Sequence, residues 1–204
     1  MEDGYNGTGD EIGSCARERF GLDYLFPYQR LVIANVLSAI DVGERSGRYR
    51  PKAGTSAVPD DAEETDEFTR GRQIVILPTG AGKSLCFQLP AALVTGVTLV
   101  IYPLLSLMND QERRIRNAGF SVVQIKGGQS REERTAAFNA ARSQRCDFVL
   151  SNPETLVGRE VRDVLSESNV VHTVIDEAHC ISEWGDTFRE AYLTVGESIA
   201  AIGG

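Results

Sequence analysis

Short apolar runs alternate with longer helical patterns over most of this chain, and this alternation constrains the fold more than any other feature. Five runs rich in β-branched residues are predicted to be strands, at 73–77, 97–102, 121–125, 147–151 and 170–175. Helices are predicted between them, near 83–93, 105–118, 130–143 and 154–167. Strands that alternate with helices are joined by right-handed crossovers. The chain is therefore predicted to be an α/β protein with a doubly wound parallel sheet.

Composition divides the chain into four segments. Residues 1–19 are polar and are predicted to be a disordered N-terminus. Residues 20–42 are predicted to be a helical segment, because apolar residues recur at steps of three and four from residue 27 to residue 42. Residues 43–72 hold a run of acidic residues and little to bury, which predicts a disordered acidic insertion. The main domain is predicted over 73–204.

Charge and cysteine usage narrow the classes of protein. The net charge of -8 argues against a chain that holds nucleic acid by bulk positive charge. The four cysteines are scattered and contain no CxxC pair, which favours reduced thiols and a cytoplasmic protein. The most apolar stretch, 89–108, is interrupted by two prolines and a glycine, so no membrane association is expected.

The stretch "LPTGAGKS", Leu77 to Ser84, follows the first predicted strand and opens a helix. Glycines there let backbone amides turn toward an anion, and the helix N-terminus adds partial positive charge. Lys83 would neutralise the β- and γ-phosphates of a bound nucleotide, and the Ser84 hydroxyl would hold Mg²⁺. A glycine-rich turn with a solvated lysine is the alternative. The residues expected to bind the nucleotide here are Thr79, Gly80, Ala81, Gly82, Lys83 and Ser84.

The stretch "VVHTVIDEAHC" places two carboxylates at the end of a predicted buried strand. The carboxyl edge of a parallel sheet is where such folds bind ligands. Asp176 would take the Mg²⁺ opposite Ser84, and Glu177 would deprotonate the attacking water. A metal site made by His179 and Cys180 is disfavoured, because no second cysteine lies at ligand spacing. Asp176, Glu177 and Lys83 are thus the predicted catalytic residues.

With these motifs in place, the chain resembles the first RecA-like lobe of superfamily 2 helicases, and specifically the RecQ family of ATP-dependent DNA helicases. The resemblance runs from about residue 20 to residue 196, interrupted by 43–72. The stretches that carry it are "FGLDYLFPYQ", "LPTGAGKSLCFQLPA", "YPLLSLMNDQ", "SNPETL" and "DEAHCISEWG" continuing to Phe188-Arg189.

The resemblance implies a P-loop NTPase that hydrolyses ATP with Mg²⁺ and belongs to a 3'-5' unwinding machine of DNA recombination and repair. It implies that Gln29 reads adenine and that His179 couples the nucleotide state to DNA. It implies that Trp184, Phe188 and Arg189, joined by Tyr192, sense single-stranded DNA, which suits aromatic and guanidinium chemistry. The implied partners are single-stranded or partly duplex DNA and a second helicase lobe, which a separate gene could encode.

By the same resemblance the RecA-like lobe is expected to be incomplete, truncated after "DEAH", residues 176–179, which we call the acidic box. Without the arginine fingers of a second lobe, which contribute about 10³ to 10⁵ in rate, it should hydrolyse ATP feebly and should not unwind DNA alone. One alternative is a non-catalytic remnant that binds nucleotide, DNA or a partner. Another is an unrelated P-loop protein such as a transporter ATPase or a small-molecule kinase.

Overall fold

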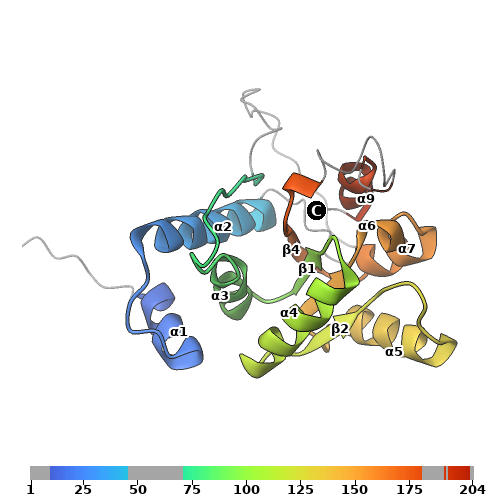
Figure 1. Ribbon diagram of the computed structural model, residues 1–204, viewed down its shortest axis with the longest axis horizontal. Coiled ribbons are helices and arrows are strands. Elements are labelled where there is room, and N and C mark those ends of the chain that lie inside the picture. Colours follow the sequence, from blue (N-terminus) through green and yellow to red (C-terminus); the bar gives the residue numbers. More distant parts are fainter. Residues whose placement is uncertain (1–9, 46–70, 181–190, 192, 203–204) are drawn as a thin grey trace, which may run out of the picture.

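A single parallel sheet forms the centre of the computed structural model, which describes residues 10–45, 71–180, 191 and 193–202 (Figure 1). Its strands are β1 (Val97–Ile101), β2 (Val122–Gln124), β3 (Phe148–Ser151) and β4 (Val170–Ile175). They lie in the order β2-β3-β1-β4, and every pair is parallel. Four of the five predicted strands are confirmed, together with the α/β class.

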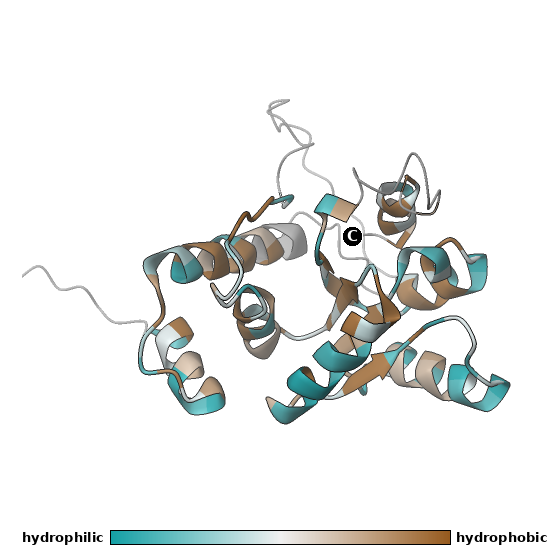
Figure 2. Cartoon of the chain, in the orientation of Figure 1, coloured by the Kyte–Doolittle hydropathy of each residue, from teal (hydrophilic) through white to brown (hydrophobic). Residues whose placement is uncertain are grey.

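Helices cover both faces of the sheet, as a doubly wound fold requires. One face packs against α5 (Arg131–Arg142), α6 (Pro153–Leu156), α7 (Arg159–Ser166) and α9 (Val195–Ile202). The other face packs against α3 (Leu85–Leu93) and α4 (Leu105–Asn117). Successive residues of β1 point to opposite faces of the sheet. Leu99 packs in the core under α5, α6, α7 and α9, and Val100 packs in the core under α3 and α4. The hydrophobic colour of Figure 2 accordingly concentrates on the strands between the helices.

The N-terminal region forms two helices, α1 (Glu11–Phe20) and α2 (Pro27–Arg45). The helix predicted within 20–42 is confirmed, but the disorder predicted over 1–19 is wrong for residues 10–19. Helix α1 begins at Asp10, whose carboxylate accepts a hydrogen bond from the Gly13 N–H at 3.0 Å. Its buried Ala16 joins a third core with residues of α2 and α3. These packing contacts offset the polar composition that suggested disorder.

Residues 73–77 are not a strand, which corrects the prediction made for them. The segment makes no strand pairing with the sheet, and Ile74 and Ile76 are 92% and 90% exposed. Figure 2 shows it as a hydrophobic stretch outside the sheet. An apolar run in a sequence indicates only that a segment can be buried, whereas a strand also needs the backbone of a neighbour.

Helix boundaries follow local capping chemistry. The capping box predicted for α5 is confirmed, since Ser130 Oγ accepts from the Glu133 N–H at 3.1 Å and Glu133 Oε2 accepts from the Ser130 N–H at 2.8 Å. The helix predicted at 154–167 is instead divided into α6 and α7, with Gly158 at the start of the second. Asn152 precedes α6 as predicted, but its Oδ1 accepts from the Thr155 hydroxyl.

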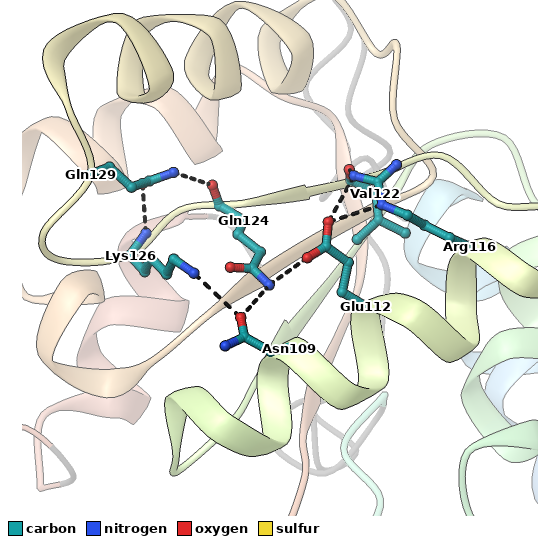
Figure 3. Close-up of polar contacts among 7 residues, drawn as sticks. All are labelled: Asn109, Glu112, Arg116, Val122, Gln124, Lys126 and Gln129. Carbon is teal, nitrogen blue, oxygen red and sulfur yellow. Dashed lines mark hydrogen bonds and ion pairs between the residues drawn. The ribbon is translucent and has the colours of Figure 1, made fainter.

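A polar network fastens α4 to the edge strand β2 (Figure 3). The Gln124 Nε2 donates to Glu112 Oε2 at 2.6 Å and to Asn109 Oδ1 at 3.0 Å. Arg116 donates from Nε to Glu112 Oε1 at 2.9 Å and also reaches the Val122 carbonyl. Glu112 is therefore the central acceptor of this network, and it joins helix and strand by hydrogen bonds that do not depend on core packing.

Candidate functional site

The loop before α3 has the backbone that its glycines predict. Gly80 and Gly82 have φ angles of 81° and 75°, in the left-handed region that favours glycine. A Cβ atom at Gly82 would lie 2.6 Å from the Gln29 Nε2, so a side chain there would also clash. The sequence "TGAGKS" therefore forms a tight curl whose backbone angles favour glycine at these two places.

The hydrogen bonds of the loop separate its amides into two groups. The Ala81 N–H donates to the Pro78 carbonyl at 3.2 Å, so this amide is used inside the loop, unlike the inward-pointing amide that we predict. Within the part of the chain that the structure describes, the N–H groups of Gly80, Gly82, Lys83 and Ser84 make no hydrogen bond. The Ser84 side chain caps no helix amide either. These groups are thus available to bind an anion and its counter-ion.

Gln29 lies against this loop rather than in solvent. It is 6% exposed, its Oε1 accepts from the Phe26 N–H at 3.0 Å, and its Nε2 donates to the Ala81 carbonyl at 2.9 Å. The Tyr28 hydroxyl donates to the same carbonyl at 3.2 Å. The start of α2 is therefore hydrogen-bonded to the loop 77–84, the predicted phosphate loop, and the adenine-reading role of Gln29 stays a prediction.

The two predicted acidic residues follow β4 directly. The Asp176 N–H donates to the Ile101 carbonyl at 3.0 Å, which holds this residue at the carboxyl edge of the sheet. Its Oδ1 accepts from the Glu177 N–H at 3.0 Å. Burial raises the pKa of the Asp176 carboxyl, and the hydrogen bond from Glu177 opposes part of this shift. A cation beside Asp176 would stabilise its ionised form.

Glu177 contacts both Lys83, in the loop before α3, and His179, two residues further along its own motif. Its Oε1 lies 3.7 Å from the Lys83 Nζ, and its Oε2 lies 3.3 Å from the His179 Nδ1. The backbone of Glu177 has a φ of 52°, an angle that costs on the order of 1 kcal/mol or more for a residue other than glycine. The structure thus brings Lys83, Glu177 and His179 together, and the roles predicted for them stay predictions.

Mg²⁺ takes oxygen ligands and keeps several waters, so a serine hydroxyl and one carboxylate form a donor set of the right chemistry. Ser84 and Asp176 supply those oxygens, and they remain the predicted metal ligands. Among the residues that the structure describes, no cluster of three or more histidine, cysteine, aspartate or glutamate side chains could hold a metal ion. The Cys180 Sγ lies 3.7 Å from the His179 Nε2, which is a local contact between neighbours.

The predicted DNA-sensing residues Trp184, Phe188 and Arg189 lie outside the described residues, as does Tyr192. Two tyrosines that the sequence reasoning missed lie at this site instead. Tyr28 binds the loop, and the fully buried Tyr102 follows β1. Burial, with a smaller effect from the Asp176 carboxylate, raises the pKa of Tyr102, and its hydroxyl finds no partner among the described residues. The sequence signal for Tyr102 was its position directly after an apolar strand, at the edge of the sheet where the site lies.

Comparison with known families shows which family the chain belongs to. The profile of the DEAD/DEAH box helicases matches residues 27–201, which includes the phosphate loop and the acidic box. The chain belongs to the DEAD/DEAH box helicase family. Within the helices that the structure describes, none is long and apolar enough to cross a bilayer.

Several curated relatives are RecQ helicases. The ATP-dependent DNA helicase RecQ of Synechocystis is 39% identical over 132 residues, which are 64% of this chain and 28% of that protein. RecQ of Bacillus subtilis is 40% identical over 120 residues, 59% of this chain and 20% of that protein. The recognised resemblance to RecQ helicases is confirmed over these residues. The chain spans less than a third of the length of either relative.

Solved helicase structures share the fold of this DEAD/DEAH box chain. A hypothetical ATP-dependent RNA helicase from Sulfolobus tokodaii superposes with a TM-score of 0.56 at 18% identity, covering 95% of this chain and 46% of that one. The DUF1998 helicase MrfA bound to DNA gives 0.54 at 21% identity, covering 85% and 22%. At such low identity these similarities show the α/β fold alone.

Proposed function

We propose that this chain is the ATP-binding lobe of a RecQ-like ATP-dependent DNA helicase, and that it binds and hydrolyses ATP with Mg²⁺. The observation that carries the proposal is the 3.7 Å contact between Lys83 and Glu177. The fold brings these two residues, 94 positions apart (177 minus 83), into one site at the carboxyl edge of the sheet. RecQ relatives that are about 40% identical support the choice of helicase class.

Each residue of the site has a role that its chemistry suits. Lys83 and the unbonded amides of Gly80 and Gly82 bind the terminal phosphates of ATP. Ser84 and Asp176 hold Mg²⁺, which when bound neutralises phosphate charge. Glu177 accepts the proton of the attacking water, and it is suitably placed because its carboxylate is 35% exposed and already faces Lys83. His179, which contacts Glu177, is where DNA binding would influence hydrolysis.

The proposed partner is single-stranded or partly duplex DNA, together with a second helicase lobe. The names of the relatives support this, because the RecQ proteins are DNA helicases and MrfA was solved bound to DNA. A contribution to 3'-5' unwinding in DNA recombination and repair is proposed for the whole protein. The described cysteines are free thiols, which supports action in the reducing cytoplasm.

Release of phosphate from Mg·ATP, measured with and without single-stranded DNA, tests the proposed activity. The Glu177→Gln variant should still bind ATP and should lose turnover by about 10²-fold or more, because it lacks the general base. The Lys83→Ala variant should lose ATP binding itself. Lys126→Ala is the matched control, since Lys126 contacts Asn109 outside the site and should leave ATP binding unchanged.

The outcomes separate the proposed enzyme from a binding module. Turnover that Glu177→Gln leaves intact would show that the activity belongs to another group or to a contaminant. ATP binding without turnover in the unchanged chain would favour the non-catalytic module. Failure of the unchanged chain to bind ATP at all would refute the proposed site.

A further inference from the structure

Two consecutive residues at the start of α2 donate hydrogen bonds to one carbonyl of the phosphate loop. The Tyr28 hydroxyl lies 3.2 Å from the Ala81 oxygen, and the Gln29 Nε2 lies 2.9 Å from it. A carbonyl oxygen has two lone pairs, so these two donors use its full accepting capacity. The peptide that joins Ala81 to Gly82 is therefore held from one side.

Holding this carbonyl also orients an amide. In a trans peptide the C=O and N–H bonds point in opposite directions, and the structure contains no cis peptide among its described residues. Because the Ala81 carbonyl points toward α2, the Gly82 N–H points away from it. Glycine leaves the peptide before it free to rotate, and Gly82 has the φ of 75° that such freedom permits. The two donors restrict that rotation.

An aromatic stack holds the Tyr28 ring in place. The rings of Phe26 and Tyr28 are stacked, with centroids 5.4 Å apart and planes within 6°. The ring of Tyr24 meets Phe26 edge-on at 5.6 Å. Stacked and edge-on contacts of this kind stabilise ring positions in addition to the area they bury. The Tyr28 hydroxyl is thus fixed over the loop although the ring lies at the surface.

We propose that Tyr28 is a positioning residue of the nucleotide site, which holds the Ala81–Gly82 peptide so that the Gly82 N–H is directed at the nucleotide phosphates. The inference rests on the proposed function, because it requires that the loop binds phosphates. It assigns to Tyr28 an effect on ligands that carry a β-phosphate and none on the adenosine part.

Competition against a fluorescent ADP analogue tests this role. Removal of the hydroxyl in Tyr28→Phe should weaken ADP binding about 3- to 10-fold, as the loss of one hydrogen bond does, and should change AMP binding less than about 2-fold. Tyr24→Phe is the matched control, because it removes the hydroxyl of another exposed tyrosine in the same aromatic stack. It should leave both affinities unchanged. Melting temperatures of both variants show whether the fold is intact.

Three results would overturn the inference. Unchanged ADP binding in Tyr28→Phe would show that the hydroxyl does not matter. Equal weakening of ADP and AMP would place its effect on the adenosine part or on the fold as a whole. Equal weakening by Tyr24→Phe would show that the stack acts without the Ala81 contact. If the unchanged chain and Lys83→Ala bind ADP equally poorly, the proposed function itself fails, which is a separate result.

Discussion

Within the four strands that the structure describes, His172 is the only residue with an ionisable side chain. It lies on the edge strand β4 opposite Thr98 of β1, and its Nδ1 is inaccessible to solvent and without a partner among the described residues. Burial lowers the pKa of His172 to about 4 from an ordinary value of 6.5. The folded protein therefore holds a neutral imidazole at a pH where the unfolded chain would protonate it.

This residue makes stability depend on pH. Because the folded pKa is depressed, the unfolded chain binds the extra proton between pH 6.5 and pH 4, so stability is complete above that window and falls as the pH decreases through it. We expect the loss to be on the order of 2 kcal/mol at pH 4.5, measured by chemical denaturation. His172→Gln should remove most of this loss. His179→Gln, which changes the other of the two histidines, should retain it; a profile identical in all three proteins would contradict the assignment.

At the scale of the elements, local signals were predictable from the sequence and pairing was not. The start of α5 could be predicted because Ser130 and Glu133 lie three positions apart and cap each other. Tyr28 and Ala81 are 53 positions apart in the sequence, and no local pattern predicts their contact. Residues 73–77 show the same limit, since their apolar pattern is real but the partner strand that they need is not specified locally. For the site, the motifs singled out Lys83, Glu177 and His179, and only the fold showed that these three residues contact one another.

The attachment of α4 to β2 depends on Glu112. Its two carboxylate oxygens accept from Gln124 and Arg116, and its side chain is 25% exposed. We expect Glu112→Ala to lower the free energy of unfolding by about 1 kcal/mol, because charged hydrogen bonds at a partly exposed site contribute about this much. Asp110→Ala is the control on the same helix, since its ion pair with Arg113 is largely exposed and should contribute little. Equal losses in both variants would argue against the network.

At the scale of the molecule, the site lies where two packed units meet. The sheet carries Asp176 and Glu177, whereas α1 and α2 pack on α3, which begins just after Ser84. The ion pair of Lys83 with Glu177 crosses between these units, and the hydrogen bond of Gln29 joins α2 to the loop before α3. A nucleotide bound there would touch both, so binding should stabilise the whole domain and not only the loop.

Thermal melting measures this linkage. A ligand at 100 times its dissociation constant stabilises the folded state by about 2.7 kcal/mol, which should raise the melting temperature of a chain this size by roughly 5–10 °C. We expect such a rise with Mg·ADP and a smaller one when EDTA removes the metal. Asp176→Asn should lose the magnesium-dependent part of the shift. Asp163→Asn, which changes an exposed aspartate on α7, should keep it; equal behaviour of the two variants would remove Asp176 from the metal site.

The strand order also has a consequence for folding of the chain during its synthesis on the ribosome. β1 lies in the middle of the sheet and pairs with β3 and β4, which both come later in the chain. Thr98 of β1 pairs with Phe148 of β3, 50 positions further on. At about 5–20 residues per second, synthesis needs roughly 3–10 s to supply the first of these partners. During that interval β1, which is fully buried in the folded protein and apolar except for Thr98, has no strand to pair with. A nascent chain of this topology should therefore depend on chaperones that shield β1 until β3 emerges.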